Sequence, residues 1–215
     1  MAKTDFIRRN YPAEFRADGE SGLIEGVPIV FDTPTDIGGL FQETIVKGAI
    51  TEEVLRADVA FFFNHNLDGL KIARSIIPLK DKGGMEFDIT DEGVKMRVNP
   101  NRTRSDVNDL YLAIEDRVID GMSFMFAVAE ERWEDENTDY PKRFITRIDP
   151  VIEVSAVNYP AYKSTSINVA RGDFASENDK AAIGKLRERQ QALREGDAQA
   201  KKALELLKLK YQYLY

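Results

Sequence analysis

Short apolar runs separated by turn-forming residues fill the middle of the chain, and they constrain its fold more than any other feature. Runs of about four to eight residues, rich in aromatic and β-branched side chains and bounded by Gly, Pro, Asn or Asp, are typical of β-strands. Pro28 cannot donate a ladder hydrogen bond, so its strand should lie at an edge or contain a bulge. The predicted strands cover residues 22–31, 43–46, 59–63, 70–79, 85–89, 93–98, 122–128, 144–148 and 151–157.

Two segments show helical patterns instead. Thr51 is placed to cap a short helix ending near Asp58, because acidic residues follow it where a helix N-terminus favours negative charge. A second helix has Ser105 as its N-cap and Gly121 as its terminator, and its apolar face comprises Val107, Leu110, Tyr111, Ile114 and Val118. Many short strands with few helices predict an α+β, mainly β fold, a closed or nearly closed β-barrel flanked by helices.

Composition excludes several classes of function. The 215 residues include no cysteine and one histidine, which rules out disulfides and thiol catalysis and argues against a zinc site. We therefore expect no cofactor and no metal. The longest apolar run, residues 59–63, is too short to cross a bilayer, and residues 1–10 lack the apolar core of a secretory signal. These features predict an intracellular protein without a membrane contact.

Charge and composition divide the chain in two. Residues 1–170 hold 20 Lys+Arg and 30 Asp+Glu, whereas residues 171–215 hold 10 and 7, so an acidic body precedes a basic tail. An acidic body argues against nucleic acid as the main partner. We predict a barrel domain over 1–170, a polar linker over 171–179 and a helical tail over 180–215. The tail is rich in strong helix formers, with an expected break at Gly196 and Asp197.

The single histidine, His65, directly follows the aromatic run at 59–63. Imidazole is the only side chain that exchanges a proton near neutral pH without a perturbed pKa, so hydroxyl-based catalysis in this chain must use His65 as its base. A carboxylate would have to orient the ring, since no second histidine exists. Position alone favours the alternative, a strand-end histidine that caps or packs.

Four segments together point to a known family. They are NHN at 64–66, GMSFMF at 121–126, VIEVSAVNYPA at 151–161 and ETIVKGAI at 43–50. Their order and spacing resemble the prohead proteases of tailed bacteriophages, which are serine endopeptidases that process scaffold and capsid protein during head maturation. The resemblance covers about residues 26–168. It implies a fold similar to the herpesvirus assembly protease, a helix-decorated β-barrel whose third triad member is a histidine that this chain cannot supply.

The resemblance implies that Ser123 is the nucleophile and His65 its base. Alternation along the strand places Ser123 on the face opposite its aromatic neighbours, where a nucleophile can be exposed. Two positions depart from the family pattern: Met125 stands where members commonly have glycine, and Asn66 where many have aspartate. Neither change removes a proton-transfer group, although Met125 could alter the substrate pocket.

Glu153 is the predicted third member of the triad. Its strand is apolar on both faces, and an ionised carboxylate in such a setting needs a partner. His65 suits that role, because a carboxylate can hold one imidazole tautomer and stabilise the imidazolium. Arg147 is the alternative partner of Glu153, and Ser155 is the alternative nucleophile.

The sequence therefore predicts a serine endopeptidase of phage prohead assembly, with capsid protein and scaffold polypeptide as its substrates. Self-cleavage within the linker and a homo-oligomer are further expectations, and the expected location is the host cytoplasm, within the viral prohead. The alternative is a non-catalytic assembly or scaffolding module, in which the barrel serves only as a binding platform. Retention of both proton-handling residues, His65 and Ser123, favours the protease.

Overall fold

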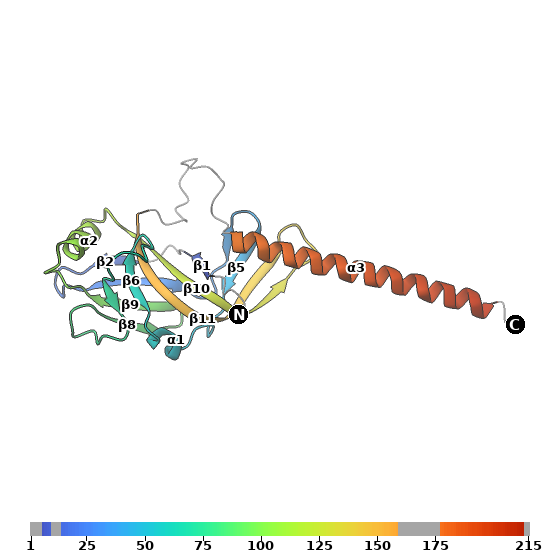
Figure 1. Ribbon diagram of the computed structural model, residues 1–215, viewed down its shortest axis with the longest axis horizontal. Coiled ribbons are helices and arrows are strands. Elements are labelled where there is room, and N and C mark those ends of the chain that lie inside the picture. The colour runs from blue at the N-terminus through green and yellow to red at the C-terminus, as the bar shows by residue number, and fades with distance from the viewer. Residues whose placement is uncertain (1–5, 10–13, 159–176, 213–215) are drawn as a thin grey trace.

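The computed structural model of the chain describes residues 6–9, 14–158 and 177–212. A curled sheet forms the body, and the helix α3 extends from it as a long rod (Figure 1). The mainly β, α+β class is confirmed, although the sheet is a curled half-barrel rather than a closed barrel. The strands are β1 (Phe6–Arg9), β2 (Phe15–Ala17), β3 (Ile24–Val30), β4 (Thr35–Ile37), β5 (Phe41–Ile45), β6 (Ala60–Phe63), β7 (Ala73–Arg74), β8 (Gly84–Ile89), β9 (Gly93–Asn99), β10 (Gly121–Glu134) and β11 (Lys142–Val157). The helices are α1 (Glu52–Arg56), α2 (Ser105–Glu115) and α3 (Glu177–Gln212).

The two longest strands, β10 and β11, organise the sheet. Hydrogen-bonded neighbours follow the order β1-β10-β11-β6-β7-β8-β9-β3-β2. β10 and β11 are antiparallel, and β11 takes two parallel partners, β5 beside its beginning and β6 beside its end. Segments far apart in the chain, at residues 60–63, 121–125 and 153–157, therefore lie on adjacent strands.

The sheet curls until β3 approaches β10 across the core. A Cβ atom added to Gly26 of β3 would lie 2.3 Å from the sulfur of Met122 and 3.1 Å from the carbonyl oxygen of Glu14. Glycine at this position thus lets the two strands approach, a use to which glycine in a strand is often put. One hydrophobic core fills the concave side, with contributions from nearly every strand and from α1 and α2.

Most predicted strands are present, with some differences. The strand containing Pro28 has a register shift between Gly26 and Ile29, which confirms the expected bulge. The prediction of a strand over 70–79 is wrong. Only Ala73–Arg74 forms a strand there, and the rest of the segment forms turns or irregular structure. The strands predicted over 144–148 and 151–157 are one strand, β11. β1, β2 and β4 were not predicted, since three or four residues give too little alternation to detect.

The two predicted body helices are present. Thr51 caps α1 through a hydrogen bond from the backbone N–H of Val54 to its hydroxyl (3.4 Å). α2 begins at Ser105, one position earlier than expected, and Arg104 occupies the N-cap without a side-chain cap bond. α2 also ends at Glu115, so Val118 lies beyond the helix and is 75% exposed.

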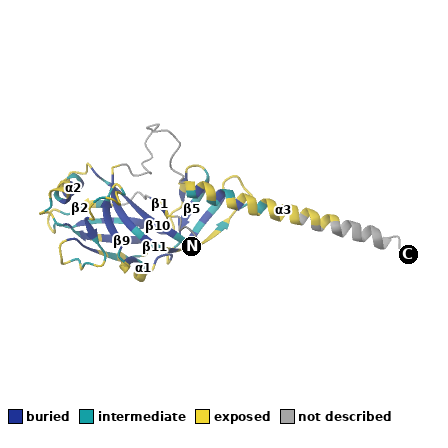
Figure 2. Cartoon of the chain, viewed as in Figure 1, coloured by how far each residue is buried: buried dark blue, intermediate teal, exposed yellow. Residues whose placement is uncertain are grey.

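α3 begins at Glu177, inside the range predicted as linker, and runs through Gly196 without the expected break. Its first turns contact the body, and the residues after them whose burial is described, up to residue 202, are largely exposed (Figure 2). Ile183 and Leu186 pack against Ile37 and Phe41 in a second hydrophobic cluster. The predicted division into barrel, linker and tail stays a prediction, because most of 171–179 lies outside the described residues. None of the described helices is long and apolar enough to cross a membrane.

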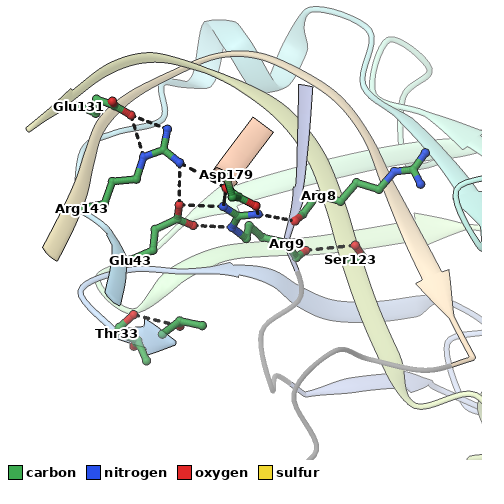
Figure 3. A network of polar contacts seen from close by, with 9 residues as sticks. Arg8, Arg9, Thr33, Glu43, Ser123, Glu131, Arg143 and Asp179 are labelled. Atoms are coloured by element: carbon green, nitrogen blue, oxygen red, sulfur yellow. Dashed lines mark hydrogen bonds and ion pairs between the residues drawn. The ribbon is translucent and has the colours of Figure 1, made fainter. Parts of the chain in front are cut away.

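A buried ion cluster fastens the start of α3 to the sheet (Figure 3). Arg9 of β1 donates to Glu43 of β5 at 2.6 and 2.9 Å and to Asp179 of α3 at 2.6 and 3.2 Å. Arg143 of β11 donates to Glu43 at 3.1 Å and also pairs with Glu131. Burial alone would lower the pKa of Arg9, but Glu43 and Asp179 outweigh it and raise that pKa well above its ordinary value.

Candidate functional site

The candidate site lies on the face of β10 and β11 that points away from the main core. Phe124 and Phe126 stack in that core with their ring centroids 4.6 Å apart, so the alternating residues of β10 face the other way. Ser123 is paired with Ser155 across the two strands, and Met125 is paired with Glu153. Directly opposed side chains of an antiparallel pair share one face, with their Cβ atoms about 5 Å apart.

His65 and Glu153, which are 88 positions apart in the chain, meet at this face. The ring nitrogen Nδ1 of His65 lies 2.6 Å from Oε1 of Glu153. Glu153 is fully buried, whereas 13% of the His65 side chain is exposed. Arg147, the alternative partner of this carboxylate, instead forms a surface ion pair with Glu130 at 3.0 Å.

A tight turn after β6 aims the histidine at that carboxylate. Asn64 and His65 both adopt left-handed conformations, with φ of 52° and 56°, which are uncommon for residues other than glycine. Asn64 fastens the turn to the end of β11 through both its backbone and its side chain. Asn64 donates its N–H to the carbonyl of Ala156 (2.8 Å) and accepts the N–H of Asn158 on its side-chain oxygen (3.0 Å).

Ser155 contacts both members of this pair. Its hydroxyl donates to Oε2 of Glu153, and it accepts the backbone N–H of His65 at 3.1 Å. Both oxygens of the buried carboxylate are therefore occupied, one by imidazole and one by a hydroxyl. The sequence prediction had treated Ser155 only as an alternative nucleophile. Its position two residues after Glu153 was the signal that the two share a face.

Ser123 is fully buried rather than exposed as expected. Its hydroxyl donates to the backbone carbonyl oxygen of Arg9 at 3.1 Å (Figure 3). The edge strand β1 thus lies against the predicted nucleophile, since β1 pairs with β10 from Phe6 to Arg9. Sequence reasoning missed this contact, because nothing in the short segment around Arg9 indicates a strand beside Ser123.

The arrangement brings the His65 imidazole and the Ser155 hydroxyl to the Glu153 carboxylate, with Ser123 opposite Ser155 on the neighbouring strand. A carboxylate only accepts hydrogen bonds, so an ionised Glu153 selects the tautomer with a proton on Nδ1 and leaves the lone pair on Nε2. That is the protonation state a general base for a serine hydroxyl requires. Within the ranges that the structure describes, no group of three or more His, Cys, Asp or Glu side chains could hold a metal ion.

Comparison with known proteins gives a consistent result. The sequence model of the family described as caudovirus prohead serine protease matches residues 10–180. The chain is 27% identical over 155 residues to the prohead protease of Enterobacteria phage HK97, which covers 72% of this chain and 62% of that protein. This chain thus spans less than two thirds of that relative. No solved structure matches it significantly.

Proposed function

Because the chain belongs to the caudovirus prohead serine protease family, we propose that it is a serine endopeptidase that processes scaffold or major capsid protein during prohead assembly and maturation. The family membership and the HK97 relative support the class of enzyme and its setting in the prohead, and a location in the host cytoplasm is part of the proposal. The contact between His65 and Glu153 at 2.6 Å is the observation that carries the mechanism. It supplies the imidazole and the partner carboxylate that hydroxyl-based catalysis needs, and so supports the protease over a histidine that only caps or packs.

In the proposed reaction, Ser123 attacks the carbonyl carbon of the scissile peptide bond. Nε2 of His65 takes the hydroxyl proton, and Glu153 stabilises the imidazolium that forms. The same proton passes to the leaving amine as the peptide C–N bond breaks, which leaves an acyl group on Ser123. Water, deprotonated by His65, then hydrolyses this ester and restores the serine.

Substrate entry must rearrange the surroundings of Ser123. Its hydroxyl is fully buried and bonded to the carbonyl of Arg9, so the contact with β1 has to break before the proton can pass to His65. The described arrangement is therefore a closed resting state of the proposed enzyme. A non-catalytic assembly module would also leave Ser123 buried, and this observation keeps that alternative open to test.

A serine-directed fluorophosphonate probe separates the two functions and the two serines. We expect the probe to form a covalent adduct on Ser123 of the native chain, located by peptide mapping. Ser123→Ala should abolish both labelling and the cleavage of scaffold or capsid protein, while Ser155 stays unlabelled. Labelling of Ser155 would reassign the nucleophile. A native chain that neither reacts with the probe nor cuts scaffold would favour the assembly module.

Self-processing is a further part of the proposal. Most of the predicted cleavage range, 171–179, lies outside the described residues. Exposed polar connections are preferred sites of nicking, so we expect the native chain to trim itself there while Ser123→Ala stays intact. Intact masses measured over time decide the matter, and equal trimming of both chains would point to a contaminating protease.

The same samples, run on a sizing column with light scattering, test the expected homo-oligomer.

A further inference from the structure

We propose that Ser155 is a positioning residue that holds both the carboxylate of Glu153 and the turn of His65 in their working arrangement. This inference rests on the function proposed above. It assigns Ser155 a role other than that of nucleophile and rests on the two hydrogen bonds of its hydroxyl. Each bond fixes a different degree of freedom of the pair formed by His65 and Glu153.

The first bond fixes the carboxylate. Oε1 of Glu153 faces Nδ1 of His65 at 2.6 Å, and Oε2 accepts the hydroxyl of Ser155. A carboxylate held through one oxygen can still rotate about its last side-chain bond. One held through both oxygens cannot rotate without breaking a bond. Glu153 and Ser155 are both fully buried, so no water competes for this contact, and losing a donor to a buried charge is costly.

The second bond fixes the histidine backbone. Ser155 accepts the backbone N–H of His65 at 3.1 Å. His65 and the residue before it, Asn64, both lie in the left-handed region. Such conformations are costly for residues other than glycine and persist only where surrounding contacts impose them. The Asn64 contacts with Ala156 and Asn158 fasten one side of the turn, and Ser155 fastens the other. One hydroxyl therefore ties the backbone of the base to β11, the strand that carries its orienting carboxylate.

The same contacts argue against Ser155 as nucleophile. Its proton is committed to a carboxylate, and one of its lone pairs is committed to a backbone N–H. Attack by Ser155 would break both bonds and release the turn that aims the base. The hydroxyl of Ser123 donates instead to the carbonyl of Arg9, on the β1 side of β10.

The test compares Ser155→Ala with Ser155→Thr, which keeps a hydroxyl, and with Ser75→Ala as the matched control. Ser75 likewise accepts a backbone N–H, that of Val59 at 2.9 Å, but it does not contact the site. We expect Ser155→Ala to lower kcat for scaffold cleavage by about 10- to 100-fold with little change in KM, because a donor to a charged group is lost. Ser155→Thr should recover most of that loss, and Ser75→Ala should keep the native kcat.

A second readout does not depend on turnover. With one histidine in the chain, the ¹⁵N-labelled imidazole spectrum reports only on His65. The native chain should show a proton on Nδ1, the ring nitrogen that lies 2.6 Å from Glu153. In Ser155→Ala the Nδ1 proton should exchange with water faster and its signal should broaden, whereas Ser155→Thr and Ser75→Ala keep the native spectrum.

These measurements separate failure of the inference from failure of the proposed function. Native kcat together with a native spectrum in Ser155→Ala would overturn the positioning role. An equal loss in Ser75→Ala would overturn it too, since the effect would then be one of general stability. If the native chain cuts neither scaffold nor capsid protein, the proposed function fails, and the imidazole spectrum alone still supports or overturns the role of Ser155.

Discussion

Glu43→Gln is expected to destabilise the protein strongly, because Glu43 lies at the centre of the buried ion cluster. The carboxylate is fully buried and accepts hydrogen bonds from two guanidinium groups, those of Arg9 and Arg143. Replacement by an amide removes the negative charge that both guanidinium groups share, although Asp179 still faces Arg9 and the partly exposed Glu131 still pairs with Arg143. The cluster joins β1, β5, β11 and α3, so its loss should loosen both the edge strand beside Ser123 and the start of α3.

The magnitude follows from the burial of the cluster. Removing one partner of a buried ion pair costs about 3–5 kcal/mol of the free energy of unfolding. A domain of this size loses about 2–4 °C of Tm for each kcal/mol. The expected fall in Tm is therefore roughly 6–20 °C. The lower part of that range is favoured, because the amide oxygen of glutamine still accepts one of the original hydrogen bonds.

Thermal unfolding followed by circular dichroism measures this effect, with Glu25→Gln as the matched control. Glu25 pairs with Arg16 at 2.8 Å on the surface, where an ion pair contributes about 0–1 kcal/mol. The Tm gap between the two variants should persist in high salt, which screens exposed pairs far more than buried ones. Similar Tm values for the two variants would refute the reasoning, as would a gap that closes with added salt.

Three further changes test other parts of the structure. Glu153→Gln should keep the native fold yet lower turnover of a scaffold peptide by about 10³- to 10⁴-fold, because a neutral amide cannot stabilise an imidazolium; unchanged turnover would move the orienting role elsewhere. Gly26→Ala should lower Tm, since its Cβ would lie 2.3 Å from the sulfur of Met122, whereas Gly184→Ala in open space on α3 should raise it by removing a helix glycine. Ile183→Asp should expose the start of α3 to proteases while the Tm of the body changes little, and identical digestion patterns would argue against docking of α3.

Local pattern was sufficient for much of the fold. Thr51 capped the expected helix, the bulge near Pro28 appeared, and the aromatic run before His65 formed a buried strand. These features depend on neighbours within a few positions, which a sequence displays directly. The strand wrongly predicted over 70–79 and the missed strand β1 are failures of the same rule. Pairing in a sheet is decided by partners far away in the chain.

The sequence by itself determined the inventory of the site: one imidazole, no thiol, and motifs whose order and spacing resemble one family. It also determined which face of β10 carries Ser123, because alternation is a property of the strand alone. The sequence predicted Glu153 as the partner of His65 but left Arg147 open as the alternative partner of Glu153, and only the tertiary structure decided between them. The pairing of β6 with β11 brings His65 to Glu153, which lies 88 positions further along the chain. It likewise decided that Ser155 contacts both His65 and Glu153, and that Arg9 lies against Ser123. Contacts between distant strands follow from sheet register, which no local pattern encodes.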